Sequence, residues 1–226
     1  MFFKSLSMAL ATTALVGLSA PAFAEEPNFD ATATAAPAAV AKYGLAQDLY
    51  AMGVEMKDAL MVVTAAKIAS GVQMTDVERE KETQTSEVTE EEDTADSPTD
   101  VATMLATAKE LAADDETMMA MIEDIEAESA RGRIGGASRT LSRLPAGAVD
   151  VWKIPFYGQS YAEVGIAGDG DAPLSAVVTD EYGNRVGCAR SYDTIYCNFV
   201  PVRNGYFFVT VANNGRKRNS YYLLTN

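Results

Sequence analysis

The sequence predicts an α+β protein with two unlike parts, a helical hairpin toward the N-terminus and an all-β sandwich toward the C-terminus. Apolar residues recur at helical spacing in the first part and alternate at strand spacing in the second. The charges divide at the same place, since residues 25–133 hold 25 acidic and 8 basic side chains whereas residues 134–226 hold 7 and 9. We therefore predict an acidic helical region over 25–130, a linker over 131–144 and a sandwich domain over 145–226.

The first 24 residues have the composition of a secretory signal peptide. Lys4 precedes an apolar run, and the small-residue pattern Ala22-Phe23-Ala24 stands directly before two glutamates. The apolar run is shorter than the roughly 18 residues that a membrane-spanning helix needs. We expect cleavage after Ala24 and a periplasmic or secreted mature protein without a membrane span.

The composition excludes several kinds of active site. The chain has no histidine, two cysteines and a formal net charge of −14. A Ser-His-Asp triad, a histidine-based zinc site and a four-cysteine metal site are therefore impossible. Nucleic-acid binding is not expected, because it requires a concentrated basic surface. Since the chain also lacks a nucleophile motif such as GxSxG, we expect a protein that is not an enzyme.

Two helices are predicted in the acidic region. Apolar residues from Leu45 to Ala66 follow one another at alternating steps of four and three, the spacing of a one-sided helix or a coiled coil. A second series runs from Val101 to Ile125, with Ser97 as the predicted N-cap. Because two helices alone make a thin core, we expect the hairpin to pack on the β half, on a partner or on a second copy in a homo-oligomer.

Between these helices, residues 76–97 are predicted to be a flexible linker with a run of four acidic residues at 90–93. An acidic, calcium-buffering envelope protein is an alternative interpretation of this stretch, although the ligand spacing of an EF-hand is missing. In the second helix, Met118-Met119-Ala120-Met121 predicts an adaptable apolar face for a partner helix. A copper site is the weaker interpretation, since no histidine or cysteine lies nearby in sequence.

Short strands are predicted throughout the second half. Apolar and polar residues alternate there in runs separated by glycine, asparagine and aspartate. The predicted strands are 152–156, 162–166, 174–178, 186–190, 194–200, 206–211 and 221–224. This number of short strands, with no helical window between them, predicts a two-sheet sandwich.

The two cysteines fit one hairpin of that sandwich. If Tyr192 and Asp193 form its tip, Cys188 faces Cys197 at a pair without backbone hydrogen bonds, where the α-carbons approach most closely. Export into an oxidising compartment would favour their oxidation. We predict a structural disulfide between Cys188 and Cys197.

Four stretches of the second half resemble the pre-peptidase C-terminal domain of bacterial secreted proteins. Glycine, aromatic and Asp/Asn turn positions match in order at 161–171 (YAEVGIAGDGD), 177–186 (VVTDEYGNRV), 204–213 (NGYFFVTVAN) and 219–224 (NSYYLL). The resemblance covers about 145–226. It implies a jelly-roll-like sandwich of the kind appended to secreted peptidases, similar to collagen- or carbohydrate-binding modules and sometimes holding calcium.

The resemblance makes Asp169 and Asp171 the candidate calcium ligands. Family members continue after this turn with aspartates that alternate with apolar residues, whereas this chain continues Ala172-Pro173-Leu174-Ser175. The substitution removes candidate carboxylate ligands. We therefore expect a tight, solvated turn and no cofactor.

The candidate binding residues of the sandwich are aromatic and basic. They are Tyr157, Tyr161, Tyr182, Tyr192, Tyr196, Arg216, Lys217 and Arg218. Aromatic side chains are natural contacts for proteins and sugars, so we expect a non-catalytic, exported protein that binds a protein or polysaccharide of the cell envelope. The alternative is a hydrolase, or a hydrolase accessory, that uses carboxylates of Asp169, Asp171 or Asp180.

Overall fold

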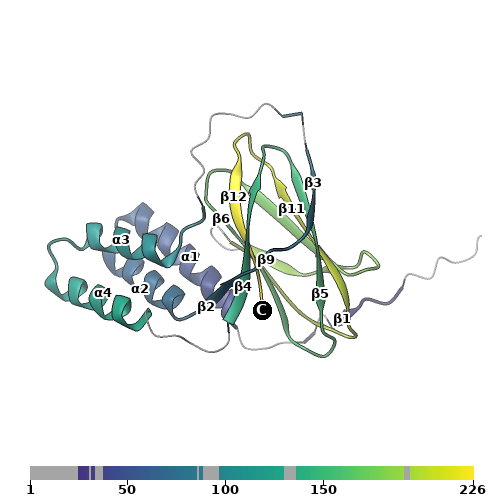
Figure 1. Cartoon of the computed structure of the whole chain (residues 1–226), viewed down its shortest axis with the longest axis horizontal. Helices are drawn as coiled ribbons and strands as arrows, with labels where there is room; N and C mark the ends of the chain where they lie inside the picture. The colour runs from purple at the N-terminus through teal and green to yellow at the C-terminus, as the bar shows by residue number, and fades with distance from the viewer. Residues whose placement is uncertain are drawn as a thin grey trace, which may run out of the picture.

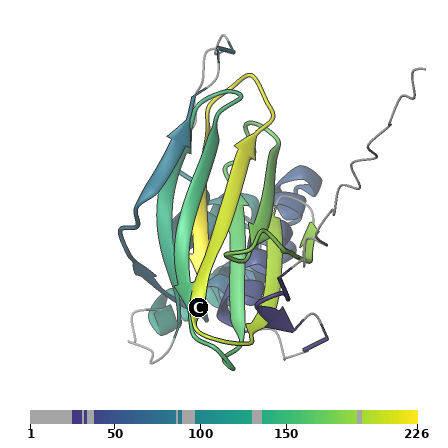
Figure 2. The same cartoon turned by 90° about the vertical axis from the view of Figure 1, so that its right-hand side faces the viewer.

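The computed structural model describes residues 25–30, 32–33, 38–85, 87–88, 97–129, 136–190 and 194–226, and the predicted signal peptide lies outside these ranges. Among the described residues, four helices lie on one side of a sandwich of two β-sheets (Figure 1). The predicted α+β class and the predicted sandwich are confirmed. Seen from the opposite side of the sandwich, the strands lie in front of the helices (Figure 2).

The helices are α1 (Ala39–Met56), α2 (Ala59–Ser70), α3 (Val101–Leu111) and α4 (Glu116–Ser129). The strands are β1 (Phe29–Asp30), β2 (Gln73–Asp76), β3 (Lys81–Gln84), β4 (Gly136–Leu144), β5 (Val149–Phe156), β6 (Ala162–Gly168), β7 (Leu174–Thr179), β8 (Arg185–Val186), β9 (Cys188–Arg190), β10 (Thr194–Pro201), β11 (Gly205–Asn213) and β12 (Asn219–Thr225). One sheet has the order β1-β10-β6-β12-β4-β2 with β9 also paired to β10, and the other has the order β3-β5-β11-β7-β8.

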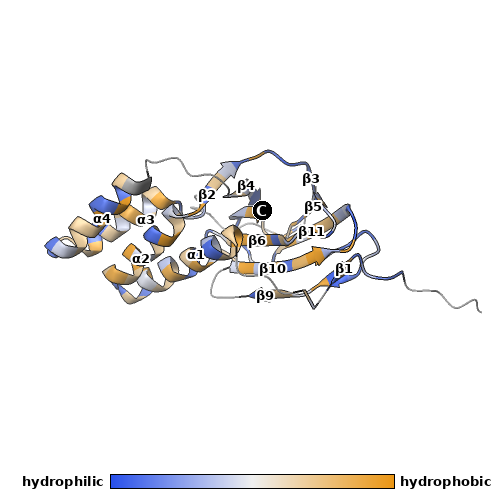
Figure 3. Cartoon of the chain, turned by 90° about the horizontal axis from the view of Figure 1, so that it is seen from below, coloured by the Kyte–Doolittle hydropathy of each residue, from blue (hydrophilic) through white to orange (hydrophobic). Residues whose placement is uncertain are grey.

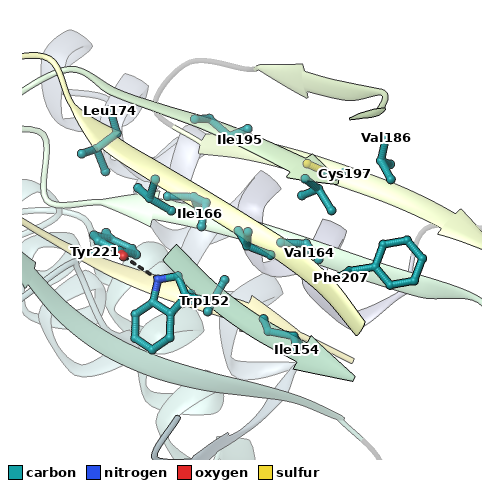
Figure 4. Close-up of a cluster of buried hydrophobic side chains, with 14 of the residues drawn as sticks. Trp152, Ile154, Val164, Ile166, Leu174, Val186, Ile195, Cys197, Phe207 and Tyr221 are labelled. Carbon is teal, nitrogen blue, oxygen red and sulfur yellow. Dashed lines mark hydrogen bonds between the residues drawn. The ribbon is translucent and has the colours of Figure 1, made fainter. Parts of the chain in front are cut away.

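The sandwich core consists of the inward residues of both sheets. Along β5, the buried side chains Trp152, Ile154 and Phe156 alternate with exposed or half-buried ones, as the sequence pattern predicts. The ring of Trp152 lies edge-on to that of Tyr221, and the ring of Phe156 lies edge-on to those of Phe199 and Phe207. Figure 4 shows this cluster, in which side chains from the two sheets interdigitate.

The predicted disulfide is present. Cys188 of β9 pairs with Cys197 of β10 in the predicted register, and their α-carbons are 4.2 Å apart. Only nine positions separate the two cysteines, so the chain-entropy model limits the stabilisation to about 3 kcal/mol.

Each predicted helix is divided in two. Lys57 adopts a left-handed conformation that ends α1, and the side chain of Asp58 accepts a hydrogen bond from the Met61 N–H and thereby caps α2. The second predicted helix breaks at Asp115, which caps α4 in the same way. Asp100, rather than the predicted Ser97, caps α3. Short polar side chains that accept backbone hydrogen bonds override the continuous apolar spacing at these points.

The two predicted linkers contain strands, which corrects the sequence prediction. β3 lies inside the predicted flexible linker 76–97, and β4 fills 136–144 of the predicted linker 131–144. β2 pairs in parallel with β4, and β3 pairs with β5, so the acidic region contributes an edge strand to each sheet. These strands lack apolar alternation because β3 is largely exposed and because β4 buries Thr140 and Ser142 as well as Leu144. Residues 89–96, which hold the acidic run, lie outside the described residues.

A buried polar network connects β3, β4, β5 and β12. Asp150 of β5 is fully buried, and its carboxylate accepts hydrogen bonds from Lys81 Nζ at 2.7 Å and from Tyr221 Oη at 2.7 Å. Trp152 Nε1 donates in turn to Tyr221 Oη (Figure 4). Ser142 of β4 donates to the same carboxylate. Since Tyr221 and Ser142 belong to one sheet and Asp150 to the other, the network connects the two sheets.

Helix α1 packs on the outer face of the seven-stranded sheet. Val40 and Tyr43 join a cluster with Ala167, Tyr222 and Leu224 of the sheet. β6 comes close to the helix because it carries a glycine there. A Cβ added at Gly165 would lie 2.6 Å from Val40 Cγ1.

The buried carboxylate of Glu163 caps the start of α1 from the sheet. Glu163 is fully buried and accepts hydrogen bonds from the N–H groups of Ala38 at 3.0 Å and Val40 at 3.3 Å. The Tyr196 hydroxyl donates to the same carboxylate at 2.6 Å. Ala38 itself offers no side-chain acceptor, so β6 supplies the negative group that the positive end of a helix favours.

Replacing Gly165 by alanine should weaken the docking of α1, because the β-branched Val40 side chain has little rotamer freedom with which to yield. We expect the free energy of unfolding to fall by about 1–3 kcal/mol in urea denaturation followed by circular dichroism. Gly187 is the matched control, since a Cβ there meets nothing within 4 Å. Equal stability of Gly165→Ala and Gly187→Ala would contradict this contact.

Replacing Lys81 by methionine should destabilise the sheet edge and change its response to acid. Burial raises the pKa of Asp150, but hydrogen bonds from Lys81, Thr83, Tyr221 and Ser142 outweigh it and hold that pKa below its usual range. The carboxylate therefore stabilises the fold above the unfolded-state pKa, and this stabilisation is lost as the pH falls through the lower folded-state pKa.

We expect Lys81→Met to cost about 3 kcal/mol at neutral pH, the low end for a broken buried pair because Lys81 is partly exposed. Loss of the ammonium also raises the pKa of Asp150, so the stability of the variant should begin to fall at a higher pH than that of the wild type. Urea denaturation between pH 3 and 7 measures both effects. The exposed Lys42→Met serves as the control, and an identical pH profile for Lys81→Met and wild type would refute the role of the pair.

Candidate ligand-binding surface

Three exposed tyrosines gather at one end of the sandwich. Tyr157 follows β5 and is 77% exposed, Tyr206 lies on β11 and is 49% exposed, and Tyr182 lies in the turn after β7 and is 45% exposed. We call these three side chains, together with Lys153 and Arg203, the tyrosine end. Large aromatic side chains that stay exposed in a folded protein are typical of contact surfaces.

A shallow cavity of about 380 Å³ lies between two of the rings. Its lining residues are Pro155, Phe156, Tyr157, Asn204, Gly205 and Tyr206. β5 and β11 pair here with Gly205 opposite Phe156, so the cavity belongs to the sheet that none of the described helices covers. Phe156 anchors it to the sandwich core.

The loop after β5 is hydrogen-bonded to the loop after β10. The Gly158 N–H donates to Asn204 Oδ1 at 2.8 Å, and Gln159 Nε2 donates to the Val202 carbonyl at 2.8 Å. Glycine is required at 158, because a Cβ there would lie 2.6 Å from Arg203 Cα. The two loops therefore hold Tyr157 and Tyr206 in a fixed relation.

Asn28, near the start of the described chain, ties the third tyrosine to these loops. It is fully buried, and its N–H donates to Asp180 Oδ2 at 2.8 Å. Its side-chain oxygen accepts from the Arg203 N–H at 3.0 Å, and its side-chain amide donates to Glu181. The turn that carries Tyr182 and the loop that leads to Tyr206 are thus joined through one asparagine.

Two cations lie over the tyrosine rings. Lys153 Nζ is 4.2 Å from the ring centroid of Tyr206, and Arg203 Cζ is 5.1 Å from that of Tyr182. Arg203 also pairs with Glu181 at 3.1 Å. Such stacking keeps the rings and the charges together, so the surface offers apolar faces, donors and positive charge to a ligand.

The predicted residues Tyr161 and Tyr196 are not part of this surface. Their hydroxyls are 3.0 Å apart on the outer face of the other sheet, and Tyr196 donates to Glu163 beneath the start of α1. Burial and the neighbouring carboxylate raise the pKa of Tyr196 far above its ordinary value. Both side chains are half-buried and support the helix docking. Tyr192 lies outside the described residues.

The predicted basic residues lie far from the tyrosine end. Arg216, Lys217 and Arg218 follow β11, whereas Tyr206 stands at its start, so the two groups flank opposite ends of a nine-residue strand. Arg216 and Arg218 are exposed. Sequence order alone did not reveal this separation.

The predicted carboxylates act as acceptors for backbone N–H groups. Asp169 accepts from the N–H groups of Asp171 and Ser220, at 3.1 Å and 2.6 Å. Asp180 is buried and accepts from the N–H groups of Asn28, Tyr182 and Asn184.

The electrostatics of Asp180 agree with this structural role. Burial raises its pKa, but the hydrogen bonds outweigh burial and hold that pKa below its usual range. Within the part of the chain that the structure describes, no three His, Cys, Asp or Glu side chains come close enough to hold a metal ion. The calcium candidates Asp169 and Asp171 thus gain no third acidic ligand there.

Sequence reasoning missed Tyr206, Lys153 and Asn28. Strand alternation could have revealed the first two. Tyr206 directly precedes the buried Phe207 on β11, and Lys153 lies between the buried Trp152 and Ile154 on β5, so both side chains point outward. No local signal marks Asn28, whose partners lie more than 150 positions away in the chain.

Comparison with known proteins does not assign this chain to a family. No family model matches the chain, and no curated protein matches it. A solved structure, the pre-peptidase C-terminal domain of a collagenase from Bacillus anthracis, is similar over 41% of this chain and 81% of that one, with 14% identity and a TM-score of 0.26. Within the described residues, no helix is both long and apolar enough to cross a membrane.

Replacing Asn28 by alanine should loosen the tyrosine end, because the Arg203 N–H and the Glu181 carboxylate lose the partner that the Asn28 side chain provides. We expect a loss of about 1–3 kcal/mol in stability. Hydrogen–deuterium exchange should accelerate at the Arg203 amide, which donates to Asn28. Asn214→Ala, a substitution at an exposed position, is the control. Unchanged exchange at the Arg203 amide in Asn28→Ala would contradict the role of Asn28.

Proposed function

We propose that the protein is an exported, non-catalytic binding protein whose sandwich recognises a polysaccharide or protein of the cell envelope through the tyrosine end. The observation that carries this proposal is the exposure of Tyr157 and Tyr206, 77% and 49%, on either side of a shallow cavity beside two hydrogen-bonded loops. Two such rings beside one cavity offer a ligand a preformed aromatic surface. A ligand that covers them would gain the free energy of burying their apolar surface.

The chemistry of the surface supports extended polymers as ligands. Flat aromatic rings stack on sugar faces and on apolar side chains, and their hydroxyls accept or donate hydrogen bonds at the rim. Lys153 adds a positive charge beside the rings, which favours ligands that carry carboxylate or phosphate groups, whereas the charge of Arg203 is paired with Glu181. A pocket that encloses a small substrate is not needed for this kind of recognition.

The environment of the carboxylates supports a function without catalysis. An acid–base pair needs one carboxyl group with a raised pKa and free access to substrate. Asp180 has the opposite properties, since it is buried, its pKa is lowered, and it holds three backbone N–H groups. Asp169 is likewise engaged with backbone N–H groups of its turn and of β12.

Export is supported by two features of different kinds. The disulfide between Cys188 and Cys197 is stable in oxidising compartments such as the periplasm or the extracellular space. The second is the composition of residues 1–24, which is that of a secretory signal peptide.

Removing the two rings should weaken binding strongly without affecting the fold. We expect Tyr157→Ala/Tyr206→Ala to bind envelope material at least about tenfold more weakly, because central aromatic contacts dominate most interfaces. Co-sedimentation of residues 25–226 with peptidoglycan sacculi and with insoluble polysaccharides measures the glycan arm. A photo-reactive benzoyl-phenylalanine at position 157, crosslinked in envelope extract, measures the protein arm.

Met56→Ala/Leu60→Ala is the matched control, because these two apolar side chains are 65% and 51% exposed but lie at the α1–α2 turn. The proposal requires that this control bind like the wild type. Equal weakening of both double variants, or no retention and no crosslink in either arm, would refute it.

A further inference from the structure

The outermost helix, α4, carries a second surface that the sandwich function does not use. α4 lies at the end of the molecule farthest from the strands in both Figure 1 and Figure 3. Ile122 and Ile125 bury its inner side in the helical layer. The other side faces outward and includes Met121, which is 38% exposed.

A groove of about 440 Å³ runs between the start of α4 and the turn that precedes it. Its lining residues are Ala113, Asp114, Glu116, Met119, Ala120 and Glu123. Met119 is half-buried and packs on the helical core, so it forms an apolar floor that is anchored from behind. Methionine has an unbranched, polarisable side chain and adapts to apolar partners of varied shape. We call this the α4 groove.

The charge around the α4 groove specifies its partner. Residues 97–129, which form the α3–α4 hairpin, hold nine acidic and one basic residue. That one base, Lys109, is engaged by Glu126 at 2.7 Å. No basic side chain is among the six residues that line the groove. An apolar floor between carboxylates complements a helix that has leucine-like anchors on one face and lysine or arginine beside them.

The same charge disfavours the other occupants. A second copy would bring two strongly acidic hairpins together, and like charges at this density repel. An anionic bilayer surface would be repelled as well. We therefore propose that the α4 groove is a docking site for a basic amphipathic helix of a partner protein.

A defined peptide tests this proposal. The probe is an 18-residue, fluorescein-labelled peptide of lysine and leucine spaced to form an amphipathic helix, and the readout is fluorescence anisotropy with residues 25–226. We expect binding that weakens as the ionic strength rises from about 0.05 to 0.3 M. A peptide of the same composition with its leucines spread around the helix should bind at least about fivefold more weakly.

Three variants separate docking in the groove from general attraction. Asp114→Lys/Glu123→Lys should weaken binding about tenfold, whereas Glu82→Lys/Glu87→Lys, the same charge change at exposed positions of the β3 region, should weaken it less than about threefold. Ala120→Tyr leaves the charge unchanged and fills the groove, so it should weaken binding about fivefold or more. Asp115 is retained in all variants because it caps α4.

Circular dichroism establishes that each variant remains folded before binding is measured. Equal weakening by both charge reversals, equal affinity for both peptides, or full binding by Ala120→Tyr would each overturn the proposal. So would the absence of any binding to the wild type. Association of the wild type with itself at low ionic strength, seen by light scattering and abolished by Ala120→Tyr, would assign the groove to a second copy instead.

Discussion

The attachment of the helical layer to the sandwich depends on one buried carboxylate. Glu163 lies on a strand, yet it satisfies the first N–H groups of α1 and the hydroxyl of Tyr196. A carboxylate buried without such donors would cost several kcal/mol, about the total stability margin of many domains. The helix in turn needs an acceptor that Ala38 cannot provide. The carboxylate and the start of the helix thus satisfy each other, and Gly165 two residues away allows the close approach that brings them together.

The acidic and basic parts of the sequence do not form independent bodies. The segment 73–84 leaves the helices, pairs with β4 in one sheet and then crosses to pair with β5 in the other. Arg139 meets Asp76 at 2.6 Å and Lys81 meets Asp150 at 2.7 Å on the way, so opposite charges from the two parts meet at the crossing. Arg139–Asp76 joins a base of the basic part to an acid of the acidic part, and Lys81–Asp150 has the reverse arrangement, so ion pairs of both kinds connect the two parts within one fold.

The two proposed surfaces carry charges of opposite sign. The tyrosine end carries Lys153 on the sheet that none of the described helices covers, and the α4 groove is rimmed by carboxylates at the far end of the helical layer. They differ in charge and lie on different layers, so occupation of one leaves the other accessible. Taken together, the two proposals describe a connector between an envelope polymer or protein and a basic partner helix.

The sequence by itself determined the sandwich, most of its strands and the disulfide, because apolar alternation and hairpin register are local properties that need no knowledge of distant partners. Cys188 faces Cys197 for this reason. It also identified Tyr157 and Tyr182 as exposed candidates. Tertiary structure alone decided the rest. Polar strands such as β3 form only because a neighbour supplies hydrogen bonds and Asp150 supplies a charge partner. Asn28 and Glu163 act through partners more than 120 positions away, and no local pattern encodes contacts at that separation.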